Sequence, residues 1–330
     1  MSSQTSFAIR QIRFLALVLI LLHHSFCVYE GWPPNINVNI GLPASFQTIS
    51  SVCKGIGMVA FCFISGMLVY YSFIKVAATS KIMYTGWKNF IIKKFRRLIV
   101  PALIWGAFYA VFFGDYMLTE YFPNFINGTH LWFLPMLFLL MLAVSPMLFS
   151  KHLWIVPILM LGLFFLHPFS RTTNEFVLYF PAFICGFLYY ANECRKTEDV
   201  IKRVVSTAAV ILSGVIFYLL LGRFGEIFTN YGIYLFVVAI LVIVFKHVSS
   251  DLYRFFNLQA VRYATDNAFA IYIIHQFVII LIALSDISFL STATVSNVLI
   301  YFIVTLCGSL AIVYVVTFLS RRYKVVEYLF

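Results

Sequence analysis

The chain has 330 residues, of which 62% are hydrophobic and only 11% are charged, and its formal net charge is +11. So little polar surface excludes a soluble globular protein and indicates a polytopic membrane protein. The apolar runs are continuous rather than alternating, which favours helices over strands.

Apolar runs of roughly membrane-spanning length follow one another along the chain, separated by short polar breaks. They predict an all-α integral membrane protein, a bundle of about ten transmembrane helices in a single domain covering residues 1–330. The expected spans lie near residues 14–29, 55–73, 98–114, 131–149, 153–169, 176–191, 204–222, 231–246, 268–285 and 297–319. The fifth and sixth are the weakest, because prolines interrupt them, and a broken or re-entrant helix is an alternative there.

Lysine and arginine are distributed unevenly between the two sides of these spans. Twenty of the 23 lie on the amino-terminal side; Arg171 and Arg223 lie in the opposite loops, and Lys54 begins the second span. Cytoplasmic loops carry such an excess, so we expect both termini in the cytoplasm. This topology signal and attraction to anionic membrane lipids explain the net charge, and no nucleic-acid partner is expected.

The first span carries ionisable residues that are rare inside a membrane. Arg13 and His24 are eleven residues apart. Eleven steps of about 100° bring them to one helix face, about 16 Å apart, whereas His23 is expected to point elsewhere. Such residues usually face a bundle interior or a water-filled cavity and mark a function. We expect the pair to line a path between the leaflets, and the alternatives are snorkelling of Arg13 and a packing role for His24.

The next polar residues accompany the second to fourth spans. Ser65 and Gly66 lie in the second span, where close helix packing is the favoured interpretation. His130 and Trp132 open the fourth span, where an aromatic belt at the membrane surface explains the tryptophan but does not require the histidine. A basic cluster before the third span is suited to a phosphorylated cytosolic ligand, and it comprises Lys88, Lys93, Lys94, Arg96 and Arg97.

In the ninth span, Tyr272 and His275 share one helix face, and a functional role and a satisfied core histidine are equally supported. Asp266 and Asn267 just before it are expected to cap its first turn. The cysteines show no paired spacing and predict neither a disulfide framework nor a zinc site, so no metal is expected. They are Cys27, Cys53, Cys62, Cys185, Cys194 and Cys307.

Five of these elements, in order, resemble motifs of the membrane-bound acyltransferase 3 family. Arg13 to His24 resembles the Arg-X10-His signature of its first span. The other matches are Phe63-Ile64-Ser65-Gly66 with its Phe-X-Ser-Gly element, Arg96-Arg97-Leu98 and Pro101 with its basic third-span entry, His130-Leu131-Trp132-Phe133-Leu134 with its His-Leu-Trp-Phe-Leu motif, and Tyr272-Ile273-Ile274-His275 with its Tyr-Leu-X-His element. The chain departs from the family's frequent Arg-X-X-Arg, because Lys94 keeps the charge of the first arginine but lacks its bidentate fork.

The resemblance runs from about residue 10 to 320. It implies transfer of an acyl group, usually acetyl from cytosolic acetyl-CoA, to a hydroxyl or amine of a surface carbohydrate or its lipid-linked precursor. The protein is then expected in a bacterial inner membrane, with a hydroxyl as the expected acceptor group. Acyl-CoA is then a co-substrate, and no tightly bound cofactor is expected.

In this hypothesis His24 is the general base or the acyl carrier. Arg13 orients the donor or offsets the charge that develops on the thioester oxygen. Lys94, Arg96 and Arg97 bind donor phosphate. The secondary or acceptor-side residues are Ser65, His130, Trp132, Tyr272 and His275.

Two other classes of protein compete with an acyltransferase. A transporter or flippase of lipid-linked glycans would use the same buried residues as a polar path, but no inverted pairing between the two halves is visible. A glycan polymerase would be expected to have a large outer loop with several basic residues, and the longest expected outer loop, residues 30–50, has none.

Overall fold

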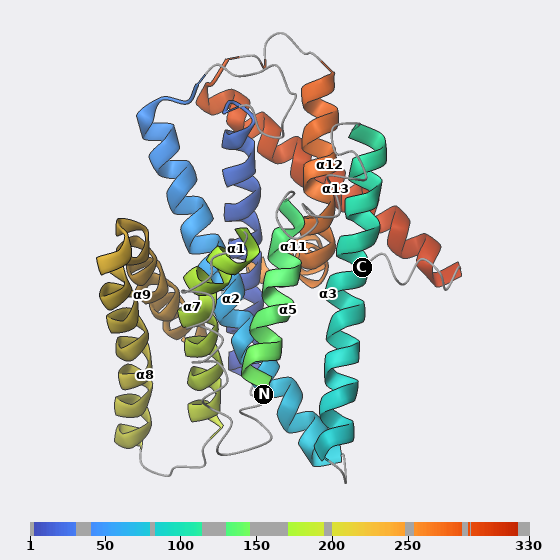
Figure 1. Ribbon diagram of the computed structural model, residues 1–330. Coiled ribbons are helices and arrows are strands. Elements are labelled where there is room, and N and C mark those ends of the chain that lie inside the picture. The colour runs from blue at the N-terminus through green and yellow to red at the C-terminus, as the bar shows by residue number, and fades with distance from the viewer. Residues whose placement is uncertain are drawn as a thin grey trace.

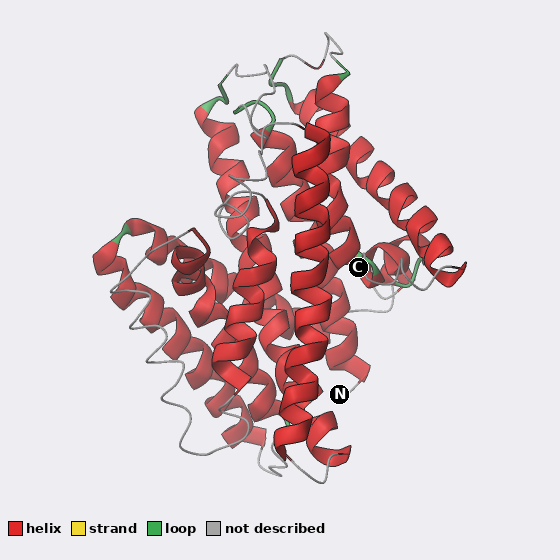
Figure 2. Cartoon of the chain, turned by 45° about the vertical axis from the view of Figure 1, so that its right-hand side comes forward, coloured by secondary structure: helices red, strands yellow, loops and turns green. Residues whose placement is uncertain are grey.

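The computed structural model describes residues 3–30, 41–79, 83–113, 130–145, 171–194, 200–247, 254–285, 290 and 292–322. The regular elements of these residues are helices, which confirms the all-α prediction (Figure 2). The long helices are α1 (Ser3–Cys27), α2 (Ala44–Thr79), α3 (Met83–Phe113), α7 (Arg171–Glu193), α8 (Val200–Leu221), α9 (Glu226–Lys246) and α13 (Val295–Arg322). The shorter ones are α5 (Phe133–Val144), α11 (Gln259–Asp266), α12 (Ala268–Leu284) and the 3-10 turns η1 (His130–Trp132) and η3 (Gly222–Phe224).

Several of these helices are long and apolar enough to cross a membrane, namely α1, α2, α8, α9 and α13, and the bent pair of α11 and α12 is a further candidate. The described residues therefore give five or six candidate spans. The sixth expected span is continuous, because α7 runs through Pro181 without a break. The expected span at 153–169 lies outside the described residues. The total of ten spans, the single domain and the cytoplasmic termini stay predictions.

The helices α1 and α2 lie in the middle of the bundle, with α8 and α9 on one flank and α3 on the other (Figure 1). Helix α2 packs most extensively on α7 and α1, and α1 also contacts α9, α12 and α13. Large apolar side chains of α8, α9 and α13 stay exposed, including Leu212, Phe236 and Phe318, as expected of helices that face lipid. The polar residues of α1 are therefore enclosed on most sides.

Helices α2 and α7 cross at two glycines that allow their backbones to touch. A Cβ atom on Gly66 would overlap the carbonyl oxygen of Phe183, and one on Gly186 would overlap the carbonyl oxygen of Phe63. Small residues at such a crossing let membrane helices gain close van der Waals contact. The packing interpretation of Gly66 is confirmed.

A sharp bend of 86° separates α11 from α12 at Asn267. The predicted cap is wrong, because Asn267 occupies the N-cap position of α12 but makes no capping bond with its side chain. Its Nδ2 donates instead to the carbonyl oxygen of Tyr263, at 2.9 Å. The amide thus adds a second hydrogen bond to a carbonyl at the end of α11 that already accepts the backbone N–H of Asn267, at 3.1 Å.

One tyrosine of α3 holds α12 in place. The hydroxyl of Tyr109 donates to the carbonyl oxygen of Ile273 and accepts from the backbone N–H of Phe277, each at 3.0 Å. These two backbone groups are four residues apart and pair with each other in a regular helix, so the hydroxyl is inserted into the hydrogen-bond ladder of α12. Nε2 of His130 donates to the same carbonyl at 3.0 Å. Helix α3 and the turn η1 therefore meet the same turn of α12.

We expect Gly66→Ala and Gly186→Ala each to destabilise the protein by about 1–3 kcal/mol or more, because the added methyl group forces α2 and α7 apart. Thermal unfolding of the detergent-solubilised protein, followed by loss of its size-exclusion peak, measures the effect. Gly225→Ala is the matched control, because its Cβ would meet only Ile227, at 3.9 Å. Equal unfolding temperatures for Gly66→Ala and Gly225→Ala would contradict the close crossing.

Tyr109→Phe is expected to cost about 1–3 kcal/mol, because it leaves buried backbone groups of α12 without the hydroxyl that bonds to both. The same thermal assay measures it. Tyr234→Phe serves as the control, since the structure gives the Tyr234 hydroxyl no hydrogen bond within the described residues. If the two variants unfold alike, the inserted hydroxyl does not hold α12.

Candidate functional site

Four of the seven histidines form a row, although three separate segments of the chain supply them. The ring of His24 lies between two others, with centroid distances of 4.9 Å to His23 and 4.8 Å to His275. His275 of α12 then contacts His130 of η1 at 5.0 Å. The row therefore runs from α1 through α12 to η1.

Backbone carbonyls of α12 orient the two far members of this row. His130 donates from Nε2 to Ile273, and His275 donates from Nδ1 to the carbonyl oxygen of Tyr272 at 2.6 Å. A neutral His275 with its proton on Nδ1 keeps a lone pair on Nε2. That buried Nε2 has no hydrogen-bond partner among the described residues. The ring beside His24 thus offers a proton acceptor.

The row opens into a cavity of about 240 Å³, here called the histidine cavity. His23, His24 and His130 line it, together with the half-buried Lys54 of α2 and the exposed Glu30. The cavity therefore combines imidazoles with one charge of each sign.

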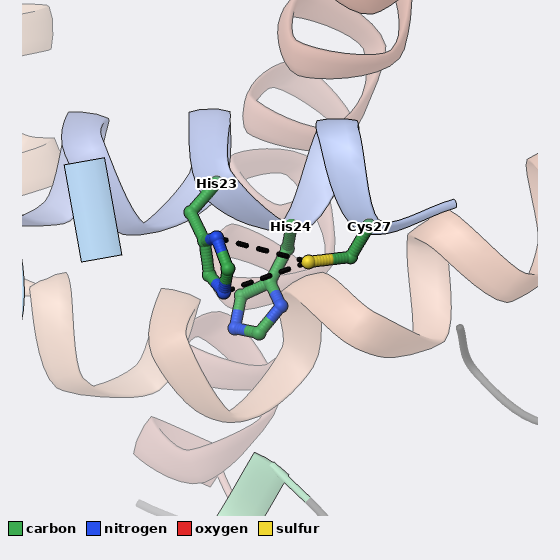
Figure 3. A group of neighbouring side chains, drawn as sticks. All are labelled: His23, His24 and Cys27. Carbon is green, nitrogen blue, oxygen red and sulfur yellow. Dashed lines mark hydrogen bonds between the residues drawn. The ribbon is translucent and has the colours of Figure 1, made fainter. Parts of the chain in front are cut away.

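The prediction that His23 points elsewhere is wrong, because His23 and His24 both border the histidine cavity. Neighbouring helix residues diverge by about 100°, and a cavity that reaches around the helix can meet both. Figure 3 shows the two rings and Cys27 gathered beside the last turns of α1. Nδ1 of His23 lies 2.8 Å from Oγ of Ser50 on α2, which fixes the ring.

A second cavity, of about 360 Å³, is here called the arginine cavity. Arg13 of α1 and Lys94 and Arg97 of α3 line it, so two helices bring three cations together. Asp266 from the end of α11 also lines it and attracts the Arg13 guanidinium. Ser65 of α2 borders the same space. An excess of positive charge in a cavity suits an anionic ligand.

Lys94 precedes the expected third span and is half-buried at this cavity. Its burial, reinforced by repulsion from Arg97 and then Lys93, lowers the pKa of the Lys94 ammonium to about 8. The residue is therefore close to losing its charge in mildly alkaline solution.

Tyr272 borders both cavities. Its hydroxyl donates to the carbonyl oxygen of His130, and its ring packs against Phe133, with centroids 5.5 Å apart. Arg13 and His24 share a helix face as predicted, but they lie in different cavities, and Tyr272 is part of the wall between them.

Two further residues predicted for the site, Trp132 and Arg96, lie in different surroundings. Trp132 is buried and stacks on Tyr179 of α7 with centroids 6.1 Å apart, so its assignment to an aromatic belt is wrong. Arg96 is exposed and lines a separate surface groove with Phe95. Lys94 and Arg97 are three positions apart, which puts them on one helix face, whereas Arg96 points in another direction.

Sequence reasoning missed Lys54, Glu30 and Tyr109 as neighbours of the site. One signal was available, because Lys54 is the cation at the far end of the second span in a chain whose other cations almost all lie on the opposite side. Nothing in the local pattern marks Tyr109, since the partners of its hydroxyl in hydrogen bonds lie more than 160 residues away in sequence.

A protein-family model described as an acyltransferase domain matches residues 7–314 of the chain. The matched range contains both cavities and the row of histidines. No curated protein and no solved structure matches the chain.

Proposed function

This chain belongs to the acyltransferase 3 family, and from that premise we propose that it moves an acyl group, expected to be acetyl, from cytosolic acyl-CoA to a hydroxyl of a cell-surface carbohydrate or lipid-linked glycan precursor. One observation carries the proposal: a cationic cavity and an imidazole-lined cavity meet at Tyr272. Their chemistries suit the two halves of such a reaction. Such O-acetylation would take place in the inner membrane of a bacterium.

The arginine cavity is the proposed donor site. Lys94 and Arg97 would hold CoA phosphates at its cytoplasmic mouth, since cations in a partly buried site form strong charge-assisted hydrogen bonds to phosphate. Arg13 would orient the thioester and stabilise the negative charge that develops on its oxygen. Arg96, in its separate groove, would attract the phosphates from outside.

The histidine cavity is the proposed acceptor site, with His24 as the reacting group. In a direct transfer, neutral His24 removes the proton of the acceptor hydroxyl as that oxygen bonds to the thioester carbon and the carbon–sulfur bond breaks. The proton then passes to the CoA thiolate. His275, in ring contact with His24, would act as its partner through Nε2. His130, Trp132 and Tyr272 would position the acceptor. Ser65 borders the arginine cavity and would have a secondary role on that side.

A two-step route uses the same residues. A nitrogen of His24 first bonds to the acyl carbon and releases CoA, and the acceptor hydroxyl then takes the acyl group from the imidazole. Capture of labelled acyl protein in the absence of an acceptor distinguishes this route from direct transfer.

We expect His24→Ala to lower acyl transfer by about 10²–10⁴-fold or more, because it removes the proposed base or carrier. The assay supplies radiolabelled acetyl-CoA to purified protein in liposomes and follows the label into extracted glycolipid and into protein. His247→Ala is the control, since His247 is exposed at the end of α9. Transfer by His24→Ala at the rate of His247→Ala would rule out the assignment of His24.

Acyl-CoA affinity is expected to fall as the pH rises through about 8, because Lys94 binds phosphate as an ammonium ion and its pKa is lowered to about 8. The ammonium is present below that pH and lost above it, whereas phosphate monoesters stay fully ionised above about pH 7. Lys94→Arg keeps its charge and should remove this part of the decline between about pH 7 and 9.

Titration of CoA binding by calorimetry across that range measures the effect of Lys94. Lys93→Arg is the matched control, because Lys93 is exposed and does not line the arginine cavity. Identical pH profiles for the wild type and Lys94→Arg would exclude Lys94 from the donor site.

A further inference from the structure

The last turns of α1 bring together three side chains of types that can bind transition metals, His23, His24 and Cys27 (Figure 3). Their potential ligand atoms all lie within 4.8 Å of one another. The spacing explains the convergence, because residues three and four apart are neighbours on a helix. Cys27 is four residues after His23 and three after His24, so it meets both rings.

The distances within this cluster fit a tetrahedral metal. Sγ of Cys27 lies 3.5 Å from Nε2 of His23. A tetrahedral zinc ion with bonds of about 2.3 Å to sulfur and about 2.0–2.1 Å to nitrogen places those two atoms about 3.5 Å apart. Small adjustments of the side chains would bring the three ligand atoms around one ion.

A neighbouring hydroxyl already orients one ligand. Ser50 is buried, and its Oγ lies 2.8 Å from Nδ1 of His23. When Nδ1 donates its proton to that oxygen, the lone pair stays on Nε2, the atom near Cys27. Metal-bound histidines almost always have such a partner on their other nitrogen, where it fixes the tautomer and the ring.

The charges around the cluster are compatible with a cation. Glu30 and an ionised Cys27 oppose the charge of Lys54, which also lines the histidine cavity. Cavity space beside His24 leaves room for water as a fourth ligand. Nitrogen and sulfur ligands favour zinc and related metals over magnesium and calcium, which prefer oxygen.

We propose that His23, His24 and Cys27 form a reversible Zn²⁺ site with one open coordination position. Binding is an acid–base reaction without redox change: the thiol proton of Cys27 is released to water, and bonds form from zinc to the sulfur and to one nitrogen of each histidine. The consequence for catalysis rests on the proposed function. Zinc coordinated by a nitrogen of His24 uses the lone pair of that nitrogen. His24 can then neither accept a proton nor carry the acyl group, so zinc inhibits acyl transfer.

The first test measures metal binding to the full-length protein in detergent, without acyl donor. Equilibrium dialysis is expected to give about one Zn²⁺ per chain. Cys27→Ala should weaken binding at least about tenfold, and Ser50→Ala by about 10–100-fold. Cys53→Ala is the control, because Cys53 is a buried cysteine of α2 outside the cluster, and its affinity should match the wild type.

Cobalt gives a second readout that needs no variant. Co²⁺ bound to the wild type should show the near-ultraviolet charge-transfer absorption of a thiolate ligand, and Zn²⁺ should remove it. The site is disproved if that absorption is absent, if Cys27→Ala binds Zn²⁺ like Cys53→Ala, or if Mg²⁺ binds equally well.

The inhibition is tested separately in the acyl-transfer assay. Added Zn²⁺ should inhibit the wild type and Cys53→Ala at the concentration that fills the site, and Cys27→Ala should need at least about ten times more. Zinc binding without transfer under any condition would leave the site in place and count against the proposed function. Transfer that stays constant while the site is filled would disprove the inhibition.

Discussion

Ionisable side chains inside an apolar bundle must border water or meet other polar groups, because exposing one to hydrocarbon costs about 2.5–3.5 kcal/mol or more. Helix α1 carries two such side chains, Arg13 and His24, at the centre of the molecule, because α2, α9, α12 and α13 pack around this helix. The bundle meets it with two cavities, one beside Arg13 and one beside His24. Helices α2 and α12 line both cavities. The close crossing with α7 holds α2, and the hydrogen bonds of Tyr109 hold α12.

The sequence was informative wherever the controlling interaction is local. Helix periodicity put Arg13 and His24 on one face, and a glycine beside Ser65 correctly indicated a close helix contact. Failures came where distant segments decide: the stacking of Trp132 on Tyr179 removes it from any membrane-surface belt. His23 shows a further limit, because the shape of a cavity, rather than the angle on the helix, determines which side chains border it.

The basic cluster in the first half of α3 shows how a helix directs residues of the same charge to different surroundings. Lys94 and Arg97 line the arginine cavity together with Arg13, whereas Arg96 lines a separate groove. The cluster of cations predicted an anionic ligand, but only the three-dimensional arrangement shows which cations line the same cavity as Arg13. The burial that lowers the pKa of Lys94 is a product of the same sorting.

Under the proposed function, the wall that contains Tyr272 would also limit the leakage of protons across the membrane. A passage that brings a polar reagent from one side of a membrane toward the other is also a route by which protons leak down their electrochemical gradient. Here the wall between the cavities contains an aromatic pair, Tyr272 and Phe133, and the tyrosine hydroxyl is already bonded to the backbone of His130. Apolar constrictions of this kind exclude continuous chains of water. Under the proposed function, the same side chains that separate the two cavities would also insulate the membrane against protons.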